Sequence, residues 1–150
     1  MSIRLLNPSE TAALIPGAKE FFAEGNLQGS LNERHFCETI SKYINSGVGF
    51  CLVDEESGVF RGSIAAAIFP DYATGDVTCM ELYWFVPKED RGLRGVRLLK
   101  SFEAEARNRG AKRIMMMHLT SGKYDKFVHF YEKCGYSLKE QVFAKELGNN

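Results

Sequence analysis

The sequence lacks the features that most readily assign a protein to a nucleic-acid-binding, metal-binding or membrane-spanning class. Lysine plus arginine and aspartate plus glutamate both number 19, so there is no cationic surplus for binding a phosphate backbone. The four cysteines include no C-x-x-C pair, and the three histidines complete no metal-ligand spacing. The longest apolar run, Ile64–Phe69, is far too short to cross a bilayer. We therefore expect no metal and no membrane association. The charge balance also argues against a nucleic-acid partner, with a nucleic-acid-binding protein that uses a local basic patch as the alternative.

Two common phosphate-binding strings are also missing. The sequence has no G-x-x-x-x-G-K-[ST] string of a P-loop, and no G-x-G-x-x-G string opens an early βαβαβ array. The first residues, MSIRLLNPSE, lack the apolar run of a signal peptide. We interpret Cys37, Cys51, Cys79 and Cys134 as reduced and mostly buried, which predicts a cytoplasmic protein.

The periodicity of apolar residues predicts a single domain, 1–150, of alternating helices and strands. At 150 residues and 45% apolar content the chain is long enough to bury a full core. Helices are expected from Ser9 with a break at Pro16–Gly17, from a Ser30–Glu33 capping box to Gly47, from Gly95 to Gly110, and over Phe127–Cys134. Strands are expected over Ile3–Leu6, Gly49–Asp54, Val59–Phe69, Val77–Val86, Ile114–Leu119 and Ser137–Leu147. This order, with antiparallel strands first and a βαβ unit last, indicates an α/β fold.

One joint between a strand and a helix has the composition of a phosphate cradle. A buried strand leads into a loop containing Arg91, Gly92, Arg94 and Gly95, and an amphipathic helix follows. Amides at a helix N-terminus have no intrahelical partner, and the helix dipole adds partial positive charge there. Glycine allows close approach of a phosphate, and arginine adds charge and paired donors. The alternative is a solvated turn whose glycines serve backbone geometry alone.

Two segments of the sequence resemble the signatures of GNAT acetyltransferases. Arg91, Gly92 and Gly95 are similar to the family's coenzyme-A-binding motif, [RQ]-x-x-G-x-[GA], in a loop that is one residue shorter and has Arg94 in place of the central glycine. The later HFYEKCGYSL resembles the family's last-helix signature, although the asparagine common before that helix is absent. The order of elements matches too, so the likeness covers nearly the whole chain.

This resemblance implies a fold, a reaction and a donor site. It implies a GNAT fold, a mixed and mainly antiparallel sheet with helices on both faces. It also implies an N-acetyltransferase that moves an acetyl group from acetyl-CoA, a dissociable cosubstrate, to a primary amine without a metal. The alternative is a non-catalytic acyl-CoA-binding module that regulates a partner. A homodimer is compatible with the sequence, although no interface can be identified. The donor-binding residues so implied are Phe85 and Val86 on the strand edge and Arg91, Gly92, Leu93, Arg94, Gly95 and Val96 in the loop.

The resemblance also implies roles in proton transfer for Glu81 and Tyr131. Glu81, in an otherwise apolar strand, matches the carboxylate base of many family members, with a buried ion pair as the alternative. Tyr131 matches the tyrosine that protonates the leaving thiolate, with a core tyrosine as the alternative. Strand alternation puts Tyr83 on the face of Glu81, where it would touch the acceptor. His118 is assigned to the same region as a second candidate base, or else as a structural histidine.

Overall fold

The computed structural model describes residues 2–25, 30–118 and 124–148. The chain divides into two compact units, Met1–Met117 and His118–Asn150. In the described ranges no helix is both long and apolar enough to cross a membrane.

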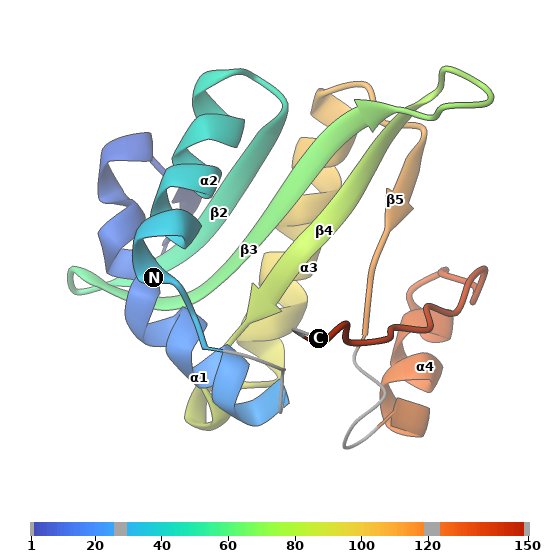
Figure 1. The fold of residues 1–150 in the computed structure, drawn as a ribbon. Helices are drawn as coiled ribbons and strands as arrows, with labels where there is room; N and C mark the ends of the chain where they lie inside the picture. The colour runs from blue at the N-terminus through green and yellow to red at the C-terminus, as the bar shows by residue number, and fades with distance from the viewer. Residues whose placement is uncertain (1, 26–29, 119–123, 149–150) are drawn as a thin grey trace. The chain divides into compact units, whose positions relative to one another are not determined.

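The first unit is built around a five-stranded mixed sheet in the order β1-β2-β3-β4-β5 (Figure 1). The first four strands pair antiparallel to their neighbours, and β5 pairs parallel to β4. The α/β class and the mixed, mainly antiparallel sheet are therefore confirmed. The strands are β1 (Ser2–Leu5), β2 (Gly49–Glu56), β3 (Val59–Pro70), β4 (Val77–Phe85) and β5 (Arg113–Met115).

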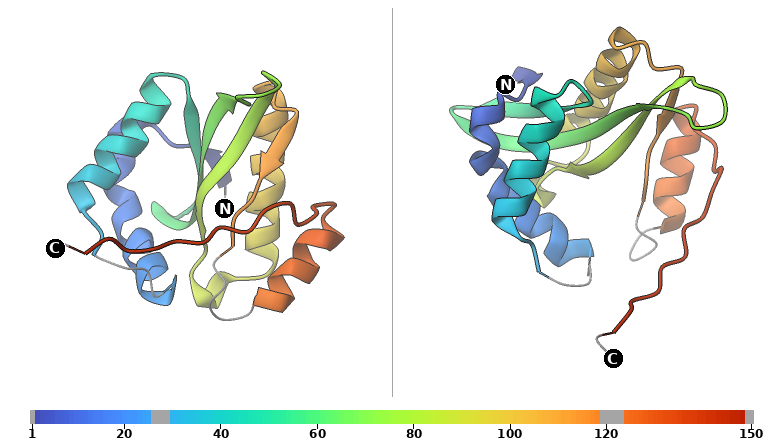
Figure 2. Two further views of the ribbon diagram at one scale, coloured as in Figure 1. Left: turned by 45° about the vertical axis from the view of Figure 1, so that its right-hand side comes forward. Right: turned by 45° about the horizontal axis from the view of Figure 1, so that its top comes forward.

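Helices of the first unit cover both faces of this sheet (Figure 2). They are η1 (Pro8–Leu14), α1 (Ile15–Gly25), α2 (Glu33–Asn45), η2 (Lys88–Asp90) and α3 (Leu93–Asn108), where η marks a 3-10 helix. Leu14 and Ile40 pack against Cys51 and other side chains on one face, the face of α1 and α2. The neighbouring residue Phe50 points to the other face, where its ring lies 5.4 Å from that of Phe102 in α3.

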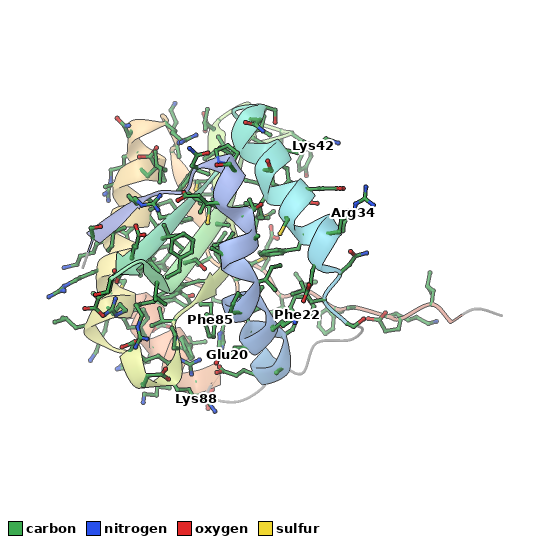
Figure 3. All side chains as sticks on the ribbon, turned by 90° about the vertical axis from the view of Figure 1, so that its left-hand side faces the viewer. Glu20, Phe22, Arg34, Lys42, Phe85 and Lys88 are labelled. Carbon is green, nitrogen blue, oxygen red and sulfur yellow. The ribbon has the colours of Figure 1, made fainter. Side chains whose placement is uncertain are left out.

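Helix α1 comes unusually close to β4. A Cβ atom on Gly17 would lie 3.0 Å from Cδ1 of Phe85, so glycine allows this approach. Figure 3 shows Phe85 beside α1 on this face. The expected break at Pro16–Gly17 takes the form of a change from 3-10 to α-helix at Ile15. This packing fixes the C-terminal end of β4, from which the Arg91–Gly95 loop continues.

Several predicted boundaries are corrected by side-chain caps. Asn7, not Ser9, caps the first helix, because its side chain accepts the Ser9 amide while Glu10 accepts the Asn7 amide. Asn32 caps α2 by accepting the His35 amide at 3.0 Å, so the Ser30–Glu33 capping box is wrong. Helix α3 begins at Leu93, two residues before the predicted start at Gly95. Strand β5 ends at Met115 and not at Leu119, which lies outside the described residues.

The second unit contains helix α4 (Tyr124–Lys133) and an irregular segment after it. Gly135, at φ 91°, ends the helix as predicted, and the Tyr136 amide donates to the Tyr131 carbonyl at 2.9 Å. The predicted strand Ser137–Leu147 is wrong, because residues 136–148 form no strand. A strand needs a partner for its ladder. The described part of this unit contains no second strand to pair with this segment.

Candidate active site at the end of strand β4

Strands β4 and β5 pair over a short stretch only, and β4 then continues alone. Thr78, Cys79 and Met80 pair with the three residues of β5, whereas β4 extends to Phe85. Along Glu81–Phe85 the edge that faced β5 therefore has no strand beside it within the described parts of the chain. The divergence is visible in Figure 1. An unpaired strand edge offers free backbone donors and acceptors to an extended ligand.

Glu81 is the first residue of β4 beyond its pairing with β5. It is 5% exposed, and no hydrogen bond or ion pair joins its carboxylate to another described residue. Burial raises the pKa of Glu81 to about 8 because the charged form loses its hydration. A carboxyl group with such a pKa can accept and release a proton near neutral pH, as a general base must.

A β-bulge separates Glu81 from Tyr83, contrary to the prediction that they share a face. Tyr83 pairs with Ala65 and Glu81 with Ala66, so the extra residue Leu82 places the two side chains on opposite faces. The Tyr83 hydroxyl lies 3.0 Å from the Ser63 hydroxyl. Burial raises the pKa of Tyr83 well above its usual value, so this hydroxyl stays protonated. The predicted shared face is therefore wrong, whereas contact of Tyr83 with the acceptor stays a prediction.

The loop after β4 provides a short row of unpaired amides. Gly92 is the N-cap residue of α3 at φ 103°, a conformation that favours glycine. The first bond of the helix runs from the Val96 amide to the Gly92 carbonyl at 3.1 Å. The amides of Leu93, Arg94 and Gly95 precede that bond and have no intrahelical acceptor. At the predicted cradle the amides of Leu93, Arg94 and Gly95 therefore have no intrahelical acceptor, whereas the Val96 amide donates to the Gly92 carbonyl.

The two arginines of the cradle have different surroundings. Arg91 donates from Nε to the Val86 carbonyl at 2.9 Å and forms an ion pair with Glu24 at the end of α1. The Arg91 side chain remains 45% exposed, so an anion can reach it. Arg94 is 12% exposed, and its Nη1 lies 2.9 Å from Oδ2 of the fully buried Asp54. Arg94 therefore faces the protein interior, which the sequence did not predict.

The remaining predicted residues lie in the second unit. The Tyr131 ring lies 5.6 Å from Tyr136 and 5.8 Å from Phe130, so it forms part of a local aromatic cluster. His118 stacks on Phe127 with ring centroids 4.3 Å apart, and burial lowers the pKa of His118. A site shared by Tyr131, His118 and Glu81 stays a prediction.

Sequence reasoning missed Asp54 and Glu24, the partners of the two loop arginines. Asp54 carried a signal, because alternation along β2 places it on the same face as the buried residues Phe50 and Leu52. Glu24 carried none, since it is one of several charged residues on α1. The described residues contain no cluster of three or more histidine, cysteine or acidic side chains suited to a metal ion. The four cysteines are free thiols: Cys51 and Cys79 are buried, Cys37 is half-buried and Cys134 is exposed.

Comparison with known proteins identifies the family. The model of the acetyltransferase (GNAT) family matches residues 18–136, which is well over half of the chain. The chain belongs to the GNAT acetyltransferase family. A search of curated proteins gives no match to this GNAT sequence.

Solved structures of other acetyltransferases share the GNAT fold at low sequence identity. A predicted acetyltransferase from Clostridium acetobutylicum, solved with acetyl-CoA, matches at TM-score 0.78 and 14% identity, over 97% of this chain and 95% of that one. A ribosomal-protein-alanine N-acetyltransferase from Brucella melitensis biovar Abortus matches at TM-score 0.73 and 14% identity, over 98% and 100%. Glucosamine-6-phosphate N-acetyltransferase from Arabidopsis thaliana matches at TM-score 0.73 and 19% identity, over 98% of each chain. These likenesses establish the fold of this family member.

Proposed function

We propose that this GNAT protein is an N-acetyltransferase that moves an acetyl group from acetyl-CoA to a primary amine. The observation that supports this most is the position of Glu81. A buried carboxyl group without a partner among the described residues lies where β4 leaves β5, on a strand that leads to a glycine-containing helix start. A buried acid without a counter-charge is costly, so a chemical role explains its presence better than a packing role.

The donor would bind along the free edge of β4 and at the first turn of α3. The pantetheine arm pairs with the backbone near Phe85 and Val86, and the pyrophosphate accepts hydrogen bonds from the amides of Leu93 to Gly95. Arg91 supports this assignment because its side chain is exposed and anchored to the Val86 carbonyl beside that turn. One β4 amide next to the thioester would polarise the carbonyl oxygen as charge develops on it.

The reaction then requires two proton transfers. An alkyl amine with a pKa near ~10.4 is mostly an ammonium ion at neutral pH, so it must lose a proton before attack. Glu81 accepts that proton, directly or through water; the amine nitrogen bonds to the acetyl carbon; and the carbon–sulfur bond breaks. Tyr131 donates a proton to the leaving thiolate, and the second proton that the attacking nitrogen loses as the acetamide forms passes through solvent and restores the Tyr131 hydroxyl. The products are an acetamide and coenzyme A.

The acceptor is a primary amine of unassigned identity. The solved structures with this fold include a ribosomal-protein-alanine N-acetyltransferase, a glucosamine-6-phosphate N-acetyltransferase, and an aminoglycoside acetyltransferase in complex with sisomicin. Acceptors thus differ widely on one fold, so the fold does not choose among them. We keep His118 as the alternative base and a homodimer as an alternative assembly.

We propose one catalytic domain acting in the cytoplasm. The family match at residues 18–136 supports one domain, because it runs across the boundary between the two compact units. The free thiols support a reducing compartment.

A direct test is the release of coenzyme A thiol from acetyl-CoA over a panel of primary amines. The panel should include polyamines, amino sugars, aminoglycosides and peptides with free N-termini. We expect turnover with at least one class, lost in Glu81→Gln and reduced in Tyr131→Phe, which keeps the ring packing. Binding of coenzyme A without turnover of any amine would favour the regulatory module. Absence of coenzyme A binding would contradict both.

A further inference from the structure

Four charged side chains from four elements meet at the first turn of α3. Asp54 comes from β2, Arg61 from β3, Asp90 from η2 and Arg94 from α3. Arg94 lies 2.9 Å from Asp54 and 3.9 Å from Asp90, and Arg61 lies 2.6 Å from Asp90. Arg94 also donates to Glu56 at 3.2 Å. The 2.9 Å contact is an ion pair and not an aligned hydrogen bond, since both Asp54 oxygens lack hydrogen-bond partners.

The backbone is distorted where this cluster forms. Asp54 pairs with Gly62 and Glu55 with Phe60, so Arg61 is an extra residue in the ladder between β2 and β3. Bulges of this kind turn a side chain away from its regular direction. Here the bulged residue, Arg61, reaches Asp90 in the segment that leads to the cradle. The cluster therefore joins the sheet to both sides of the loop.

Arg94 stands at an unfavourable position for a cation. The N-terminal end of a helix carries partial positive charge, and Arg94 lies in the first turn of α3. A phosphate ligand would explain a cation there. However, the guanidinium group has three carboxylates within 4 Å and is 12% exposed. These contacts compensate the Arg94 charge from within the protein.

We propose that Asp54 is a positioning residue for the coenzyme. Through Arg94, the buried carboxylate holds the first turn of α3 in the orientation that directs the amides of Leu93 to Gly95 at the pyrophosphate. Arg94 is then an internal anchor and not a phosphate ligand. The inference rests on the proposed function, because it concerns how the same enzyme holds its donor.

The geometry makes the pyrophosphate the part of the donor that depends on Asp54. Within the cluster, Arg94 belongs to α3 and lies next to the unpaired amides, and Asp90 belongs to the segment that leads into the loop. The β4 edge, where the pantetheine arm would lie, is held by its own ladder to β3. Loss of the Asp54 charge should therefore weaken binding of coenzyme A and leave binding of pantetheine, which lacks the pyrophosphate, nearly unchanged.

The test compares Asp54→Asn with the wild type by isothermal titration calorimetry. We expect the Kd for coenzyme A to rise roughly ten-fold, because the amides of the first turn lose their fixed orientation, while the Kd for pantetheine stays within about two-fold. The ratio of kcat/KM for acetyl-CoA to that for S-acetylpantetheine should fall by the same factor. Glu38→Gln, which breaks the exposed Arg34–Glu38 pair, is the matched control. It should change neither the two Kd values nor the ratio of the two kcat/KM values.

Two outcomes would overturn the proposal. Unchanged or tighter coenzyme A binding by Asp54→Asn would mean that Arg94, once released, serves as a phosphate ligand itself. An equal loss for coenzyme A and pantetheine would mean a general structural effect. If Asp54→Asn does not fold, Asp54→Leu/Arg94→Met removes both charges, a change often tolerated for buried pairs, and should show the same selective loss. A wild-type protein that does not bind coenzyme A at all would instead refute the proposed function.

Discussion

The two buried acids of the sheet, Asp54 on β2 and Glu81 on β4, have opposite surroundings. Asp54 is fully buried with an arginine 2.9 Å away, whereas Glu81 is 5% exposed and has no ion pair with any described residue. Burial of a carboxylate is costly in both cases. For Asp54 the charge of Arg94 offsets that cost, and for Glu81 the group avoids it by holding a proton, because burial raises its pKa to about 8. A paired buried acid is thus a structural element, and an unpaired one is a candidate for proton transfer.

The largest effect is expected from separating the Asp54 pair. Arg94→Met leaves the Asp54 carboxylate buried without its nearest cation, so the free energy of unfolding should fall by about 3–5 kcal/mol. Urea unfolding of the variant and the wild type measures this difference. The control is Arg34→Met, which breaks an exposed pair and should change stability by less than about 1 kcal/mol. Equal losses of unfolding free energy in the two variants would show that the buried pair stabilises the fold no more than the exposed pair does.

Glu81→Gln should have a smaller and opposite effect on stability, and it should depend on pH. The folded pKa of Glu81, about 8, lies above the ordinary value of 4.5, so the folded state binds its proton more tightly than the unfolded state. Wild-type stability contributed by this group is complete below pH 4.5 and is lost as pH rises through about 8. Glu81→Gln removes that loss and should be the more stable protein at pH 9, by on the order of 1–3 kcal/mol. Thermal unfolding at pH 5 and pH 9 tests the sign.

The activity of Glu81→Gln tests whether Glu81 is the general base. Wild-type kcat/KM should rise with pH through an inflection near 8, where Glu81 becomes ionised and able to accept a proton. Glu81→Gln should lower kcat/KM on the order of 10²–10⁴-fold near that pH and should regain part of the loss in alkali, where the amine is already deprotonated. A profile with an unchanged inflection would move the search for the base to His118.

Arg91→Glu should affect ligand binding more than folding. Wild-type protein at about a hundred times the Kd of coenzyme A should gain roughly 2.7 kcal/mol in stability, and the variant should lose most of that gain. The reason is that the new carboxylate would face the pyrophosphate, whereas the arginine it replaces is 45% exposed and anchors little of the core. Thermal shift with and without coenzyme A measures both quantities. A wild type with no shift would count against the donor itself.

The sequence predicted most helices and strands of the first unit. It did not predict the bulge and the buried ion pair that orient side chains at the candidate site. Strands β2 to β4 and the buried face of α3 follow from local apolar patterns, which do not depend on distant residues. The bulge at Leu82 could not be predicted, since it appears only in the register between β3 and β4, and it reversed the predicted face of Tyr83. Arg94 matched a charged loop by its neighbours in sequence, yet its partner Asp54 lies 40 positions earlier in the chain (94 − 54 = 40). The strand predicted at Ser137–Leu147 failed because strand pattern alone supplies no ladder partner.

The smallest effect concerns Glu24, which pairs with Arg91 across the start of the cradle. Coenzyme A and Glu24 would compete for the same guanidinium group, so Glu24→Gln should tighten coenzyme A binding. Glu24 and Arg91 are 31% and 45% exposed, and such pairs contribute about 0.2–1 kcal/mol, which limits the gain to roughly two- to five-fold in Kd. The gain should shrink as salt rises, because screening weakens exposed pairs first. Glu20→Gln, on the same helix, is the control, and calorimetric titration at two salt concentrations is the measurement. Weaker binding by Glu24→Gln would mean that Glu24 orients Arg91 toward the pyrophosphate instead of competing with it.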